Sequence, residues 1–167
     1  LLQELRYQEA LDMFQTAEEE GENSRLIDRG RGIAYMGMTE YEDAILCFEE
    51  ALAGSDGFVQ PVDFDLNYYL AAAFIKNGQP AEAEEVYNAI LGLRPDEVDA
   101  HFLRGNARLQ QSNYEGAKED FDRVVSLDAN NYDRMIEIYQ ALQHYGYKDV
   151  GREYLENAMR VAEDKMN

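Results

Sequence analysis

The feature that most constrains this chain is an internal repeat of about 34 residues. Four segments, YQEALDMF, YEDAILCF, PAEAEEVY and YEGAKEDF, each place an alanine three positions after an aromatic residue or proline and four positions before an aromatic residue. The alanines are Ala10, Ala44, Ala83 and Ala117, so their spacings are 34, 39 and 34 residues. A period of this length is typical of small supersecondary units that bury their apolar faces by stacking on one another.

A second helical pattern precedes each later copy, and turn-forming residues such as Asn77-Gly78 separate the two. A weaker fifth copy has Gly151 in the alanine position and Leu155 in the aromatic position. The chain is therefore predicted to fold into antiparallel helix pairs. The predicted helices cover residues 7–20, 25–38, 41–53, 64–77, 80–92, 97–111, 114–127, 131–145 and 148–165.

This period and pattern resembles the tetratricopeptide repeat. Gly32, Ala71 and Gly105 match the family's small position on the first helix, and Pro95 matches its closing proline. The tryptophan position of the family is never matched, and it holds Asp28, Asn67, His101 and Met135. The resemblance implies an all-α fold, a right-handed α-solenoid of antiparallel helix pairs. It implies a single domain over residues 1–167, with a partial repeat at 1–24 and full repeats at 25–58, 64–97, 98–131 and 132–165.

The glycine-rich stretch DRGRGIAYMG, residues 28–37, has two interpretations. A phosphate-binding loop would need a preceding strand, and none is visible. We therefore interpret Gly32 as a close contact between helices. In the last pair Tyr139 occupies the small position of the first helix, opposite Gly151. This predicts that a large side chain on one helix is compensated by a smaller one on the other. Gly30 and Gly37 each cost a helix about 1 kcal/mol relative to alanine, so this helix is predicted to be the softest one.

The spacing of 39 indicates a five-residue insertion within residues 53–65. Gly54, Gly57 and Pro61 predict a loop there. Phe58 and Val59 are expected to pack against neighbouring helices, and a recognition loop is the alternative.

The chain is strongly acidic, with a formal net charge of −19. Such a chain repels nucleic acids and anionic membranes, so we expect no nucleic-acid partner and no direct membrane contact by this segment. A charged partner would be basic. Acidic pairs such as Glu49-Glu50 fall mainly on second helices, where we expect a solvated face, with docking of a basic partner as the alternative. The absence of a signal peptide favours the cytoplasm, but the chain begins without methionine, so an exported or lipid-anchored protein stays open.

The sequence predicts no enzyme. His101 and His144 lie 43 residues apart, and no cluster of residues has metal-ligand spacing. His101 is expected to have a packing role, and His144 to be solvated. Cys47 lies among acids that would raise its pKa, which predicts an inert thiol. No catalytic residue, metal or cofactor is therefore expected.

The first helices of a stacked helix-pair fold line its concave side. Their inward stripes mix aromatic, aliphatic and amide groups, which predicts a groove for a peptide or protein partner. The chain is thus expected to be a non-catalytic interaction scaffold. The alternatives are self-assembly into a homo-oligomer, or a module of a larger membrane-anchored or enzymatic protein. The groove candidates are Arg29, Tyr68, Lys76, Phe102, Asn106, Gln110, Gln140 and His144.

Asp65, Asp99 and Asp133 recur every 34 residues. Each carboxylate is expected in the first turn of a helix, where it complements the dipole; a ladder that selects a basic ligand is the alternative. Some tetratricopeptide domains clamp a chaperone's C-terminal carboxylate with lysine, arginine and asparagine side chains. Here Tyr68, Asp99 and Leu103 occupy several of those positions, so binding of a chaperone tail is not predicted.

Overall fold

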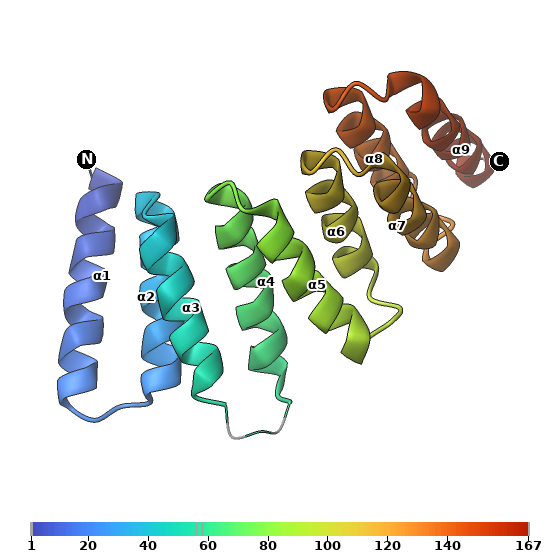
Figure 1. The fold of residues 1–167 in the computed structure, drawn as a ribbon. Coiled ribbons are helices and arrows are strands. Elements are labelled where there is room, and N and C mark those ends of the chain that lie inside the picture. Colours follow the sequence, from blue (N-terminus) through green and yellow to red (C-terminus); the bar gives the residue numbers. More distant parts are fainter. Residues whose placement is uncertain (1, 56, 58, 167) are drawn as a thin grey trace. The chain divides into compact units, whose positions relative to one another are not determined.

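The computed structural model describes residues 2–55, 57 and 59–166, which form helices joined by turns (Figure 1). Over these residues the predicted helices are confirmed. Two of them begin earlier than predicted, at Leu2 and at Pro61. The helices are α1 (Leu2–Glu19), α2 (Ser24–Met38), α3 (Tyr41–Ala53), α4 (Pro61–Lys76), α5 (Pro80–Leu93), α6 (Val98–Gln110), α7 (Tyr114–Leu127), α8 (Tyr132–His144) and α9 (Lys148–Met166). Each described helix is too short or too polar to cross a lipid bilayer.

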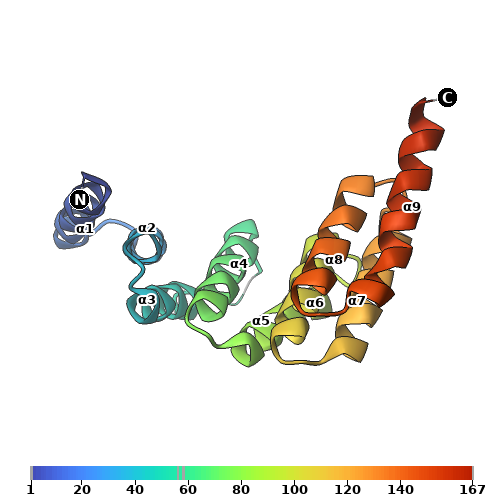
Figure 2. The same cartoon turned by 90° about the horizontal axis from the view of Figure 1, so that it is seen from above.

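The chain divides into two compact units, Leu1–Val86 and Tyr87–Asn167, and the division falls within α5. In the first unit, α2 packs on both α1 and α3, and α3 also packs on α4. In the second unit, α6 packs on α7 and α8 packs on α9, while α6 also contacts α8 (Figure 2). The predicted pairs α2 with α3, α6 with α7 and α8 with α9 are therefore confirmed. The organisation as a single domain stays a prediction.

Close packing of glycine against an aromatic ring holds the helix pairs together. A Cβ atom built on Gly32 would lie 2.5 Å from Cε1 of Phe48, and one on Gly105 would lie 2.6 Å from Cε1 of Phe121. Both phenylalanines are fully buried. The interpretation of Gly32 as a helix contact, rather than part of a phosphate loop, is thus confirmed.

The large-for-small exchange in the last pair is also confirmed, because a Cβ on Gly151 would lie 3.2 Å from Cδ2 of Tyr139. In the fifth copy the residue before the aromatic position is buried more deeply than the aromatic position itself. Tyr154 is fully buried, with its ring edge-on to Phe121 at 6.4 Å between centroids, and Leu155 is half-buried.

The two other glycines of α2 have a packing role that the sequence analysis missed. A Cβ on Gly30 would lie 2.3 Å from Cζ of Phe14, and one on Gly37 would lie 2.2 Å from Cζ of Tyr7. Tyr7 and Phe14 are seven residues apart, as are the glycines, so both rings of α1 lie on one face of α2. The glycines expected to soften α2 are therefore the places where α1 packs against it.

The insertion is partly helical, which corrects the predicted loop. Pro61 is the first residue of α4, a position where a missing N–H costs nothing. The Asp63 carboxylate accepts a hydrogen bond of 2.6 Å from the backbone N–H of Gln60 and so caps the helix. Val59 is 59% exposed, so its expected packing is wrong. Phe58 lies outside the described residues, and the recognition loop stays a prediction.

Candidate peptide-binding surface

In the first unit, Arg29 of α2 bridges to α4. Its Nη2 donates to Oδ2 of Asp65 at 3.1 Å, and its guanidinium carbon lies 5.3 Å from the ring centroid of Tyr69. The Tyr69 ring in turn stacks on Phe48 at 5.5 Å. Arg29 therefore ties two first helices together on the surface predicted to bind a ligand, and its charge is largely balanced by Asp65.

The other two candidates of this unit lie on α4. Tyr68 is half-buried, and Lys76 is exposed in the last turn, where its charge complements the helix dipole. They are eight residues apart, about two helical turns, so they share one face of α4. This face offers a half-buried aromatic ring and an exposed ammonium group to a ligand.

In the second unit, Phe102 is covered by an arginine that the sequence analysis did not identify. The Arg134 guanidinium lies 4.4 Å from the Phe102 ring centroid, and its Nη2 donates to Oδ1 of Asp99 at 2.6 Å. Phe102 also packs against Phe121, with ring centroids 6.1 Å apart. Phe102 is thus half-buried in the core of its unit, and less of its ring is accessible to a ligand than its place among the groove candidates predicted.

The remaining candidates carry uncharged hydrogen-bonding groups. Asn106 is half-buried and Gln110 exposed, one turn apart on α6. On α8, Gln140 and His144 are both exposed, and the His144 ring lies edge-on to Tyr145 at 4.9 Å. His144 is therefore accessible to solvent, as predicted. We call these four side chains the patch of the second unit, and Arg29, Tyr68 and Lys76 the patch of the first.

Two of the recurring aspartates form ion pairs with an arginine, so their carboxylates are already occupied. Asp65 pairs with Arg29, and Asp99 pairs with Arg134, in each case between neighbouring first helices. We call these pairs the arginine bridges. Because α4 begins at Pro61, Asp65 lies beyond the first turn, and its expected dipole role is wrong. Asp99 and Asp133 do lie in the first turns of α6 and α8.

A buried ionic cluster joins α6 to α7. The Asp120 carboxylate is 2% exposed and accepts from Nη2 and Nε of Arg104 at 2.7 and 3.0 Å, and from Nη1 of Arg108 at 3.0 Å. Nδ1 of His101 lies 3.0 Å from the same carboxylate, and its Nε2 lies 2.9 Å from the carbonyl oxygen of Pro95. Both ring nitrogens are engaged, which confirms the structural role predicted for His101.

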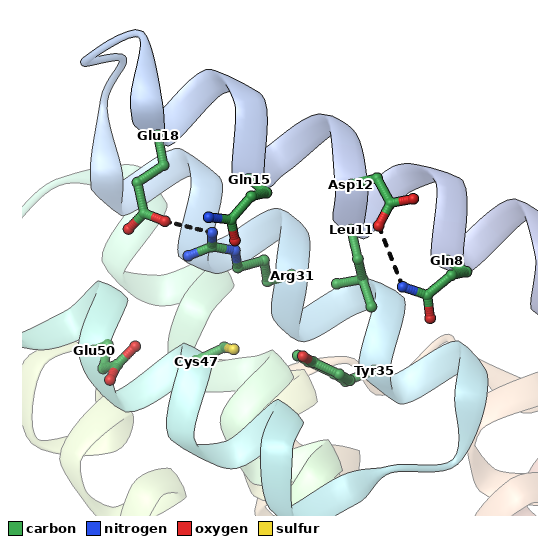
Figure 3. Close-up of a pocket in the computed structure, with 9 residues that line it drawn as sticks. All are labelled: Gln8, Leu11, Asp12, Gln15, Glu18, Arg31, Tyr35, Cys47 and Glu50. Carbon is green, nitrogen blue, oxygen red and sulfur yellow. Dashed lines mark hydrogen bonds and ion pairs between the residues drawn. The ribbon is translucent and has the colours of Figure 1, made fainter.

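A polar pocket of about 670 Å³ lies in the first unit among α1, α2 and α3 (Figure 3). Its basic residue, Arg31, donates from Nη2 to Oε2 of Glu18 at 2.6 Å and lies 3.6 Å from Asp28. Cys47 is buried in the wall opposite α1. The pocket is lined by Gln8, Leu11, Asp12, Gln15, Glu18, Arg31, Tyr35, Cys47 and Glu50.

The Cys47 thiol is not poised for nucleophilic chemistry. Burial, followed by the carboxylates of Glu50 and Asp28, raises the pKa of Cys47 to about 11. The thiol is therefore protonated at neutral pH, in agreement with the prediction of an inert thiol. Across the described residues, no group of three or more His, Cys, Asp or Glu side chains is arranged to hold a metal ion.

Comparison with known proteins identifies the family. The family model described as tetratricopeptide repeat matches residues 29–97 and 71–134. The chain belongs to the tetratricopeptide-repeat family. Among curated proteins, it is 33% identical over 113 residues to RNA polymerase II-associated protein 3 of Xenopus laevis, which covers 68% of this chain and 16% of that protein. It is 26% identical over 145 residues to the Homo sapiens protein, covering 84% of this chain and 21% of that protein.

Solved tetratricopeptide structures share the fold. MamA superposes with a TM-score of 0.73 at 17% identity, over 96% of this chain and 91% of that one. YrrB, described as having an unusual peptide-binding site, gives 0.69 at 22% identity, over 96% and 80%. The first tetratricopeptide domain of Spaghetti (RPAP3), bound to the HSP90 peptide SRMEEVD, gives 0.58 at 28% identity, over 72% and 92%. The predicted all-α solenoid class is thus confirmed.

Proposed function

We propose that this chain is a non-catalytic interaction scaffold that binds a peptide or protein segment on its first helices. The observation that carries the proposal is the chemistry of that surface. In a chain with a net charge of −19, the first helices expose Gln110, Gln140 and His144, with Asn106 half-buried beside them. Amide side chains can pair with the backbone of an extended peptide. The related domain of Spaghetti, bound to an HSP90 peptide, supports this type of ligand.

The proposal of a non-catalytic role is supported by the surroundings of Cys47 and His101. Cys47 is buried and protonated at neutral pH, and both nitrogens of His101 are engaged by oxygen atoms. A nucleophile needs an adjacent base that activates it, and neither residue is arranged in this way. The chain also spans about a sixth of the length of the Xenopus relatives, so activities of those whole proteins are not carried over.

The ligand is proposed to differ from the acidic chaperone tail bound by the Spaghetti domain. Such a tail carries several carboxylates, which need unpaired cations. Here Arg29 is already paired with Asp65, which leaves the exposed Lys76 as the cation among the first unit's candidates, and the second unit presents Asp99 with its arginine bridge. We therefore expect the peptide SRMEEVD to show no saturable binding in a calorimetric titration, with the Spaghetti domain as the positive control. Micromolar binding by this chain would contradict the proposed ligand chemistry.

The site itself is tested by affinity capture from the host with a variant of the first helices. Tyr68→Ala combined with Asn106→Ala removes contact groups from both patches, and we expect the captured partner to be lost. Leu46→Ala is the matched control, because Leu46 is 57% exposed on the second helix α3. Circular dichroism of each variant checks that helicity is retained. Equal capture by the double variant and the wild type would exclude this surface. Sedimentation of the purified chain tests the alternative of self-assembly.

A further inference from the structure

We propose that the pocket among α1, α2 and α3 binds an arginine or lysine side chain presented by a partner protein. This surface is separate from the first-helix patches, so the inference does not depend on the proposed peptide-binding site. Three elements build the pocket: α1 supplies amides and carboxylates, α2 supplies Arg31 and Tyr35, and α3 supplies Cys47 and Glu50 (Figure 3).

The second unit contains several equivalent positions and provides an internal comparison. Residues 73 positions apart are equivalent, because the repeat alanines Ala44 and Ala117 are 73 apart. Arg31 thus corresponds to Arg104, which makes the central hydrogen bonds of the buried cluster. The other equivalent pairs are Gln15 with Asn88, Asp28 with His101, Tyr35 with Arg108, Cys47 with Asp120, and Glu50 with Arg123.

The comparison shows that the second unit supplies its own second guanidinium. There, Arg108 joins Arg104 on the Asp120 carboxylate, and Asn88 accepts from Nη1 of Arg104 at 2.8 Å. In the first unit the position of Arg108 holds Tyr35, and the position of Arg123 holds Glu50. The first unit therefore has a phenol and a carboxylate where the second has two cations, and a pocket lies beside Arg31.

The charges around this space favour a cation. Arg31 is the only basic residue among those that line the pocket, and it is paired with Glu18. Asp12 and Glu50 remain in the lining as further carboxylates. Burial and the neighbouring Glu50 raise the pKa of Asp28, a sign that negative charges crowd this region. An incoming cation would relieve that repulsion.

The buried wall is suited to receive the N–H groups of such a side chain. Cys47 is 9% exposed and lines the pocket, and no hydrogen bond is recorded for its thiol among the described residues. It occupies the position where Asp120 receives two guanidinium groups in the second unit. The Cys47 sulfur, the Tyr35 hydroxyl and the Gln15 amide oxygen are all possible acceptors. The geometry therefore favours a multi-donor cation, and arginine above lysine.

The experiment titrates the ¹⁵N-labelled chain with the acetylated, amidated peptide Gly-Arg-Gly-Arg-Gly. We expect saturable shifts of the Gln8 and Gln15 side-chain amides, weaker effects with the lysine analogue, and none with the glutamate analogue. Glu50→Arg installs the residue type found at the equivalent position 123 and should weaken binding at least tenfold. Glu49→Arg is the matched control, since Glu49 is exposed, makes the same charge change and does not line the pocket.

Three results would overturn the proposal. One is the absence of saturable shifts around the pocket. Another is equal weakening by Glu50→Arg and Glu49→Arg, which would indicate a response to net charge alone. The third is a set of shifts confined to α4, α6 and α8, which would place the basic peptide on the first-helix surface. Thermal unfolding of both variants checks that they remain folded, as expected for two exposed positions.

Discussion

At the scale of single residues, Asp120 is the charged group whose burial and ion pairs matter most for stability. Its carboxylate is almost fully buried and contacts the side chains of Arg104, Arg108 and His101. Asp120→Ala leaves these groups without their acceptor, so we expect the free energy of unfolding in urea to fall by about 3 kcal/mol. Glu119→Ala, at an exposed neighbour, should change it by less than about 0.5 kcal/mol. Similar urea midpoints for the two variants would show that the cluster contributes little stability.

Two glycine-to-alanine substitutions should have opposite signs. At Gly105 the new Cβ would meet the Phe121 ring, and this overpacking is expected to cost about 1 to 3 kcal/mol. At Gly92, in α5, no atom lies within 4 Å of the new Cβ, so the better helix propensity of alanine should stabilise the fold by about 0.5 to 1 kcal/mol. Thermal unfolding of Gly105→Ala and Gly92→Ala measures both effects. A rise in Tm for Gly105→Ala would mean that the helices can separate without cost.

At the scale of helices, the start of α4 depends on Asp63. Its carboxylate caps the helix and pairs with Arg25, whose Nε also donates to the carbonyl oxygen of Ala51 at 2.8 Å. Arg25 thereby fixes both ends of the insertion. We expect Asp63→Ala to lower the free energy of unfolding by about 2 kcal/mol, because a cap and a half-buried ion pair are lost together.

The matched control for this change is Asp65→Ala on the same helix. Asp65 has an exposed carboxylate, 62% by side chain, and exposed ion pairs contribute at most about 1 kcal/mol. Chemical denaturation of the two variants gives the comparison. If Asp65→Ala proved the more damaging of the two, the arginine bridge rather than the cap would control this end of the helix.

Helices were predictable because each repeat carries its own local signals. The alanine and aromatic positions locate the second helices, and turn residues such as Asn77-Gly78 locate their ends. The start of α4 was missed because Gly54, Gly57 and Pro61 suggest a loop, whereas proline also fits the first position of a helix. The start of α1 was missed because its first turn lies before the repeated segment.

The candidate site was predictable only in part. Helical spacing identifies which side chains share a face of one helix, so the stripes on α4, α6 and α8 follow from the sequence. Their partners depend on which helices lie side by side. Arg134 over Phe102, and Asp120 between Arg104 and Arg108, join residues 12 to 32 positions apart, and no local pattern indicates these contacts. The recurring aspartates were noticed, but their arginine partners were not.

At the scale of the whole molecule, the helices differ in how deeply they are buried. No described residue of α1 from position 3 onward is fully buried, whereas Ala44, Phe48 and Ala51 of α3 have no exposed surface. We expect the amides of α1 to exchange with deuterium at least tenfold faster than those of α3, because regions with little buried apolar surface open first. Mass spectrometry of peptide fragments measures both rates. Protection of α1 equal to that of α3 would contradict this order.

The arginine bridges run in opposite directions along the chain. Arg29 reaches forward to an aspartate on the following first helix, whereas Arg134 reaches back to an aspartate on the preceding one. A recombination event that joined α2 directly to α8 would place Asp133, the equivalent of Asp65, opposite Arg29, whereas one that joined α6 to α4 would place Leu66, the equivalent of Arg134, beside Asp99. The first of these junctions would keep an arginine–aspartate pair and the second would lose it, so the hairpins are alike in shape but not freely interchangeable in order.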